Sequence, residues 1–157
     1  MAEKGACLED LTVYLFEMVP GITTSARDKK NVYETEEIDV AFWNDQHPKG
    51  FKNLDWLILV ECKNWSSPVG CDEVSWFLTK LRHRGLSFGI LIAANGITGN
   101  ARNSMQAHDL VSKAQMEKIR MIVIIRAEIE ALTDSEQFVS LVKLKMCELV
   151  ASGTVWP

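Results

Sequence analysis

The sequence lacks the features that mark several classes of protein. Its four cysteines are scattered and form no paired C-x-x-C spacing, and its three histidines do not cluster. We therefore expect reduced, mostly structural thiols and no zinc site. No apolar run is long enough to span a bilayer, and residues 1–10 carry charges and lack the apolar core of a signal peptide. These absences favour a cytoplasmic protein that does not enter a membrane.

An excess of positive charge is also missing. The formal net charge is −4, so the overall field does not favour nucleic acid. DNA binding needs only local basic surface, however, because salt screens charges beyond roughly 10 Å. Two basic clusters, at residues 27–30 and 80–84, are equally typical of solvated surface. The composition, 47% hydrophobic and 24% charged, is that of an ordinary globular protein and leaves the function open.

Hydrophobic periodicity predicts a mixed α/β fold. No repeat or linker divides the chain, so we expect one domain over residues 1–157, a length also compatible with a domain excised from a longer protein. Strand–helix–strand alternation after residue 54 predicts parallel pairing, whereas the short loop 44–53 predicts an antiparallel hairpin. We expect a central mixed sheet of four to five strands flanked by helices. The predicted helices are 6–19, 72–84 (Asp72 as N-cap), 98–118 and 134–150, and the predicted strands are 36–43, 54–63, 88–94 and 121–126, with a third strand before residue 54 left open.

Two acidic residues and one lysine are expected to meet on this sheet. Glu61 and Lys63 are two residues apart and therefore lie on one face of an apolar strand. With the hairpin loop centred near residue 49, Asp39 pairs with residue 59 or so, and Glu61 becomes its diagonal neighbour. Two carboxylates this close repel unless a divalent cation lies between them, and oxygen ligands suit magnesium or manganese. An E-x-K tripeptide alone is usually a strand end that meets solvent, so the acidic strand around Asp39 is what favours chemistry.

At these residues the sequence resembles a family. EIDV at 37–40 and LVECKNW at 59–65 look like the motifs of the PD-(D/E)XK nuclease superfamily, and specifically of its Mrr-like restriction endonucleases. The resemblance implies a restriction-endonuclease-like fold that hydrolyses DNA, with Mg²⁺ as cofactor and Mn²⁺ as a substitute. It also implies Asp39, Glu61 and the backbone carbonyl of Cys62 as metal ligands, and Lys63 as the catalytic lysine.

The sequence departs from this family in two places. Ile38 stands where the family often has proline before the aspartate, a common change. Many members also carry a glutamine on the helix after the lysine, but residues 72–84 contain none, so that accessory role is vacant or filled by another residue.

Glu9 is a further candidate metal ligand. At about 100° per helical residue, Glu9 lies at the edge of the apolar stripe of the first helix, from which an acid can reach toward the sheet. The family has an acidic residue at this place, and the alternative is a plain boundary carboxylate. The stripe is formed by Leu8, Leu11, Leu15 and Val19.

Contacts with DNA are weakly indicated. Lys80, Arg82 and Arg84 on the helix after the motif are candidates for phosphate contacts, although a solvated helix end is equally typical. Trp65 is a candidate for base contact, although packing is the commoner role, and Trp76 is expected in the core. No DNA-reading module is recognisable, so a further recognition domain or a homodimer is the expected source of specificity. We expect a metal-dependent endodeoxyribonuclease in restriction or defence. The alternatives are a repair or junction-resolving nuclease, an inactive DNA-binding module of the same fold, and a protein unrelated to nucleases.

Overall fold

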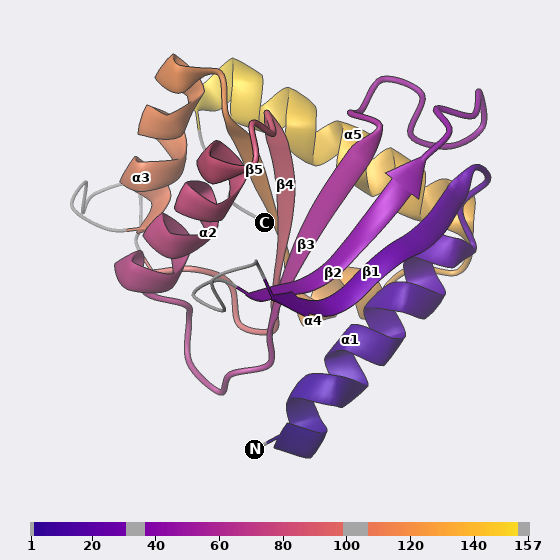
Figure 1. Cartoon of the computed structure of the whole chain (residues 1–157), viewed down its shortest axis with the longest axis horizontal. Helices are drawn as coiled ribbons and strands as arrows, with labels where there is room; N and C mark the ends of the chain where they lie inside the picture. The colour runs from indigo at the N-terminus through magenta and orange to yellow at the C-terminus, as the bar shows by residue number, and fades with distance from the viewer. Residues whose placement is uncertain (1, 31–36, 99–106, 154–157) are drawn as a thin grey trace.

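The computed structural model describes residues 2–30, 37–98 and 107–153. The helices are α1 (Ala2–Glu17), α2 (Cys71–His83), α3 (Ala107–Ala114), α4 (Arg126–Glu130) and α5 (Ser135–Ser152), with a 3-10 turn η1 (Gln115–Glu117) after α3. The strands are β1 (Ile22–Lys30), β2 (Glu37–Asn44), β3 (Leu57–Lys63), β4 (Phe88–Ala93) and β5 (Arg120–Ile124). They form one sheet in chain order, antiparallel from β1 to β3 and parallel from β3 to β5 (Figure 1). The predicted mixed sheet flanked by helices is confirmed.

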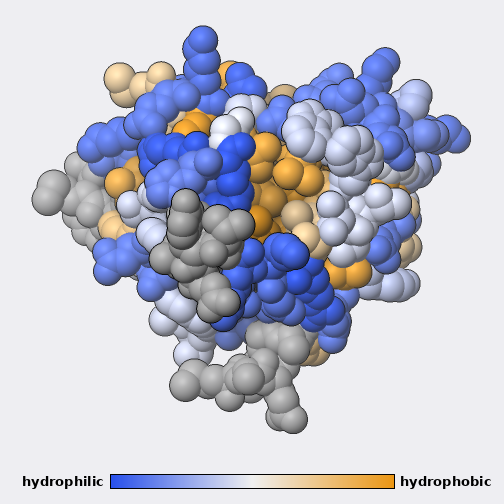
Figure 2. All heavy atoms as spheres, viewed as in Figure 1, coloured by the Kyte–Doolittle hydropathy of each residue, from blue (hydrophilic) through white to orange (hydrophobic). Residues whose placement is uncertain are grey.

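Helices cover both faces of this sheet. On one face, Phe16 of α1 stacks on Phe42 of β2 with ring centroids 4.3 Å apart and meets Phe138 of α5 at 5.0 Å. On the other face lie α2 and its neighbour α3 (Figure 1). Gly89 of β4 brings α2 close, because a Cβ there would lie 2.8 Å from the side chain of Leu81. Apolar side chains remain accessible in the middle of the face shown in Figure 2, with hydrophilic residues around them.

Most predicted elements lie within a few residues of their predicted positions, and the exceptions have physical causes. The strand left open is β1, an edge strand whose sequence is mostly polar and whose burial alternates only over its first six residues. Helix α2 has Gly70 rather than Asp72 as its N-cap. Thr98 is not helical, and residues 99–106 lie outside the described part, so the helix predicted for 98–118 is supported only from Ala107 onward. The short helix α4 was not predicted.

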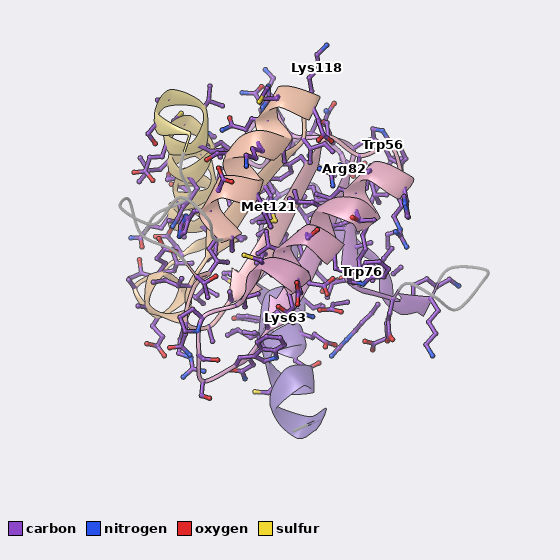
Figure 3. The ribbon with its side chains drawn as sticks, turned by 90° about the vertical axis from the view of Figure 1, so that its left-hand side faces the viewer. Trp56, Lys63, Trp76, Arg82, Lys118 and Met121 are labelled. Carbon is purple, nitrogen blue, oxygen red and sulfur yellow. The ribbon has the colours of Figure 1, made fainter. Side chains whose placement is uncertain are left out.

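Two residues expected in the core are exposed. Leu11 is 43% exposed, because it lines an open pocket of about 240 Å³ with Ile92 and Ile129. Trp76 is 46% exposed on the outer side of α2 (Figure 3), whereas the next residue, Phe77, is buried. None of the described helices combines the length and apolarity needed to cross a membrane.

The connection between β2 and β3 is held by one buried amide. The Asn44 Nδ2 group donates to the carbonyl oxygens of Phe51 at 2.9 Å and Asp55 at 3.1 Å, and its Oδ1 accepts from the Gln46 amide at 3.0 Å. Gly50, in the same connection, lies against the Pro20 carbonyl, where a Cβ would clash. The loop therefore has one fixed path, and that path sets how the two strands align.

Candidate functional site

The register of the β2–β3 hairpin sets the position of two carboxylates. Val40 pairs with Val60 and Ala41 with Leu59, so the next position along the ladder places Asp39 opposite Glu61. The predicted pairing of Asp39 with residue 59 is wrong by two residues, because the hairpin is centred on residue 50 rather than 49. The correction brings the two acids directly opposite each other instead of diagonally apart.

Alternation along β3 then divides its end between the two faces of the sheet. Glu61 and Lys63 reach the α2 side, where Glu61 meets Lys80 of that helix. Cys62 reaches the α1 side, where its Sγ lies 3.4 Å from the Thr12 hydroxyl. Burial raises the pKa of the Cys62 thiol to about 12, so this side chain is a protonated core residue. All four cysteines are free, as expected.

The surroundings of Asp39 disfavour the ionised form of its carboxyl group. Its Oδ2 accepts the backbone N–H of Cys62 at 2.8 Å and lies 3.9 Å from the Lys63 ammonium. Burial and the nearby charge of Glu61 raise the pKa of the Asp39 carboxyl, and the Cys62 amide and the nearby lysines offset only part of this. The site therefore disfavours two ionised carboxylates as it stands, which is the condition that an added cation relieves.

Glu61 is 5% exposed and meets two ammonium groups. Lys63 donates to Oε1 at 2.8 Å. Lys80 donates to Oε1 at 3.0 Å and to Oε2 at 2.7 Å. A buried carboxylate is costly unless it is paired and hydrogen-bonded, and Glu61 meets both conditions.

Lys63 is held as a cation. Burial alone would lower the pKa of its ammonium, but the charges of Glu61 and Asp39 outweigh burial and raise it. With the lysine paired in this way, its chemistry is that of a positive charge rather than of a base.

Lys80 occupies a place that the sequence did not suggest. The prediction of a solvent-facing side chain that contacts phosphate is wrong in its geometry, because Lys80 is 4% exposed and its ammonium is committed to Glu61. A signal was available: Lys80 follows the buried Phe77 by three residues, about 60° away on a helical wheel, at the edge of the apolar stripe of α2.

Glu9 lies at the margin of the site and has another partner. Its Oε2 lies 3.4 Å from the Arg27 guanidinium of β1, which also binds Asp10 at 2.6 Å. Burial, Asp28 and Asp39 raise the pKa of the Glu9 carboxyl, and Arg27 lowers it in part. Glu9 is therefore near enough to feel the charge of Asp39, and its contacts in the structure are with Arg27.

The other candidates for DNA contact are dispersed. Arg82 lies at the far end of α2 from Lys63 (Figure 3) and binds Glu117 at 2.7 Å. Arg84 donates to the Lys80 carbonyl at 3.1 Å. Trp65 is 41% exposed, two residues beyond Lys63, and its carbonyl accepts from Asn95. Of the four candidates, Trp65 combines exposure with proximity to the site.

The described residues contain no group of three or more His, Cys, Asp or Glu side chains placed to hold a metal ion. A metal ion at this site would therefore have two carboxylate ligands, those of Asp39 and Glu61. Mg²⁺ fits such a set, because it is commonly bound by one or two carboxylates, with water and substrate oxygens completing its octahedron.

Comparison with known proteins supplies the identity of the fold. A search of characterised proteins finds no match. The family model Mrr_cat, described as restriction endonuclease, matches residues 4–123. This segment begins in α1, includes Asp39, Glu61, Lys63 and Lys80, and ends within β5. The match covers more than half of the chain and includes the whole sheet apart from its last residue, so the chain belongs to the Mrr_cat family of restriction endonucleases, which are DNA-cleaving hydrolases.

Proposed function

We propose that this protein is a metal-dependent endodeoxyribonuclease that hydrolyses DNA phosphodiester bonds in restriction or defence. The observation that carries the proposal is the placement of Asp39 opposite Glu61, with the Lys63 ammonium 2.8 Å from one and 3.9 Å from the other. This arrangement occurs in a member of a restriction-endonuclease family. Membership supports DNA as the substrate, and the charges support the metal dependence.

Mg²⁺ is the proposed cofactor, with Mn²⁺ as a substitute. Asp39, Glu61 and the Cys62 carbonyl oxygen are the proposed ligands. Glu9 is proposed to assist metal binding through its negative charge at the margin of the site. The raised pKa of Asp39 supports this assignment, because burial and the charge of Glu61 disfavour its ionised form and a bound cation would favour it. When bound, a divalent cation lowers the pKa of water and offsets charge on a phosphate.

The side chains of this chain have separate tasks in the proposed reaction. Asp39 and Glu61 supply the negative charge that binds the cation. Lys63, held as an ammonium by its raised pKa, faces the phosphate and stabilises the negative charge that develops on its oxygens. Trp65 is a proposed DNA contact beside the site, and Arg82 and Arg84 are proposed contacts farther along the duplex. Lys80 is no longer among them, because its ammonium is buried.

Two other functions are alternatives that experiment can distinguish from this one. A repair or junction-resolving nuclease would use the same carboxylates and lysine on a branched substrate. An inactive DNA-binding module would keep the fold without the chemistry, and the retention of Asp39, Glu61 and Lys63 together favours activity over this alternative.

The test is cleavage of supercoiled plasmid, methylated and unmethylated, and of a four-way junction, with Mg²⁺, Mn²⁺ or chelator. Lys63→Ala serves as the protein-level control. We expect plasmid cleavage with either metal and none in chelator or by Lys63→Ala. Preference for the junction would favour repair, DNA binding without cleavage would indicate the inactive module, and cleavage in chelator would rule out metal dependence.

A further inference from the structure

Two lysines reach one carboxylate, and they differ in their access to solvent. The Lys80 side chain is 5% exposed and donates to both oxygens of Glu61. The Lys63 side chain is 21% exposed and donates to one oxygen. Lys63 therefore has room to leave Glu61 without losing all solvation, whereas an ammonium at Lys80 that left Glu61 would remain buried and unpaired.

Lys80 belongs to the packed side of α2. The other buried residues of this helix are all apolar: Val74, Phe77, Leu78 and Leu81. A lysine among them must be desolvated, and replacing a buried ion pair by apolar residues of similar size is often neutral or stabilising. Stability is therefore a weak explanation for a lysine at this position. Control of the orientation of the Glu61 carboxylate is a more specific explanation.

We propose that Lys80 is a positioning residue for the metal site: it is the permanent partner of Glu61, fixes the orientation of that carboxylate and so leaves Lys63 available to the phosphate. This inference rests on the proposed function. Carboxylates that bind metals are commonly oriented by hydrogen bonds from neighbouring groups, and loss of such a partner costs about 10- to 100-fold in metal affinity. A carboxylate has about four lone-pair sites, and the three hydrogen bonds to Glu61 leave one for a cation, with a second vacated when Lys63 turns to the phosphate.

The fold contains a matched control for this proposal. Lys145 of α5 is 2% exposed and forms an ion pair with Glu128 of α4 at 2.6 Å, although its Nζ has no hydrogen-bond partner in the part of the chain that the structure describes. It is a second buried lysine paired with a glutamate, and Glu128 hydrogen-bonds the start of α4 rather than any residue of the candidate site. Lys145→Met therefore shows what loss of a buried lysine does in the absence of a role at the site.

The test is calorimetric titration of Mn²⁺ into wild type, Lys80→Met and Lys145→Met. We expect Mn²⁺ affinity to fall about 10- to 100-fold in Lys80→Met and to stay within about twofold of wild type in Lys145→Met. At saturating Mn²⁺, Lys80→Met should lower kcat for DNA cleavage with little change in KM. If Lys80→Met does not fold, Lys80→Leu replaces it with the same expected direction, because it also removes both hydrogen bonds to Glu61.

A stability cycle in chelator supplies a second measurement. Lys80→Met should lower the melting temperature in wild type, where it leaves the Glu61 carboxylate without this partner. It should lower it less, or not at all, in Glu61→Gln, where no ionised Glu61 remains and Lys80 is itself the charge that has lost its partner. An equal decrease in both backgrounds would reduce Lys80 to core packing.

The remaining outcomes overturn the proposal in different ways. Unchanged Mn²⁺ affinity in Lys80→Met would remove the positioning role and leave the proposed function intact. Tighter binding would make Lys80 a competitor of the metal instead. A wild type that binds no Mn²⁺ would overturn both this role and the metal dependence of the proposed function.

Discussion

Within the described residues, the buried lysine–glutamate pairs Lys80–Glu61 and Lys145–Glu128 are alike in burial and distance, although Lys80 donates hydrogen bonds to its glutamate and the Lys145 Nζ has no hydrogen-bond partner. Both lysines project from the packed side of a helix, and their closest N–O distances are 2.7 and 2.6 Å. Their surroundings differ. Glu128 accepts a hydrogen bond from the Ile125 N–H at the start of α4, whereas Glu61 faces a second carboxylate and a second lysine.

This difference shows which electrostatic feature points to chemistry. A buried ion pair by itself is weak evidence of function, because well-packed folds contain such pairs for structural reasons. Two carboxylates facing each other are costly in a way that an ion pair does not relieve, and burial together with the charge of Glu61 raises the pKa of Asp39. Like-charge crowding is thus the better guide to a functional site.

The largest expected effect separates Lys63, which lies beside Glu61, from Lys145, which lies beside Glu128. Lys63→Ala should lower the rate of plasmid cleavage by roughly 100- to 1,000-fold, because it removes a charge that acts on the transition state. Its melting temperature and DNA affinity should stay near those of wild type, since Lys80 still pairs Glu61. Lys145→Met should cleave within a few-fold of wild type. Cleavage near the wild-type rate in Lys63→Ala would remove its catalytic assignment.

The next effect is the response to manganese. At a hundredfold excess over Kd, a ligand that binds only the folded state adds about 2.7 kcal/mol to stability, or roughly 5–10 °C in melting temperature for a domain of this size. Wild type and Lys145→Met should both show this shift, and Asp39→Asn should not. An Asp39→Asn variant that responds as wild type does would mean that Asp39 is a structural carboxylate and that the metal binds elsewhere.

A smaller effect concerns pH in the absence of metal. Asp39→Asn should melt above wild type in chelator at pH 7, because it removes an ionised group whose pKa is raised in the folded state and retains an oxygen for the Cys62 amide. The advantage is present above the raised pKa and shrinks as pH falls through it. Below the ordinary value of 3.8, where Asp39 is protonated in both states, the advantage should vanish. Melting curves from pH 3 to 8 measure this, and a variant that melts lower throughout would contradict it.

The smallest effect concerns the margin of the site. Glu9→Gln should weaken Mn²⁺ binding a few-fold, because it removes a negative charge near Asp39. Glu17→Gln makes the same change on the same helix, where Glu17 accepts the Thr24 hydroxyl, and should have no effect. Titration calorimetry compares the two, and equal affinities would exclude α1 from the site.

The sequence was sufficient to predict the meeting of Asp39, Glu61 and Lys63. Strand alternation decides which side chains share a face, and that rule needs only residue numbers. The partner opposite Asp39 was predicted two residues away, because the register depends on how the loop folds rather than on the strands. The bonds of Asn44 that fix this loop cannot be read from alternation.

Contacts between elements far apart in the sequence were harder to predict. The place of Lys80 depends on how α2 turns on the sheet, and a basic run at a helix end resembles solvated surface. The attachment of Glu9 to Arg27 depended on β1, a mostly polar edge strand. Polar residues at the edges of packed elements are therefore the ones that sequence patterns place least well.

The buried side-chain amide of Asn44 fixes the loop between β2 and β3, and the length of this loop determines which residue lies opposite Glu61. A one-residue insertion or deletion that shifted this hairpin would turn the side chain of Ile38 or Val40, rather than Asp39, toward the face that holds Glu61. The alignment of the two carboxylates is thus determined at the loop end of the hairpin, by the hydrogen bonds from Asn44 to the carbonyl oxygens of Phe51 and Asp55. Drift in the length of this loop would abolish the acidic pair without altering any residue that forms it.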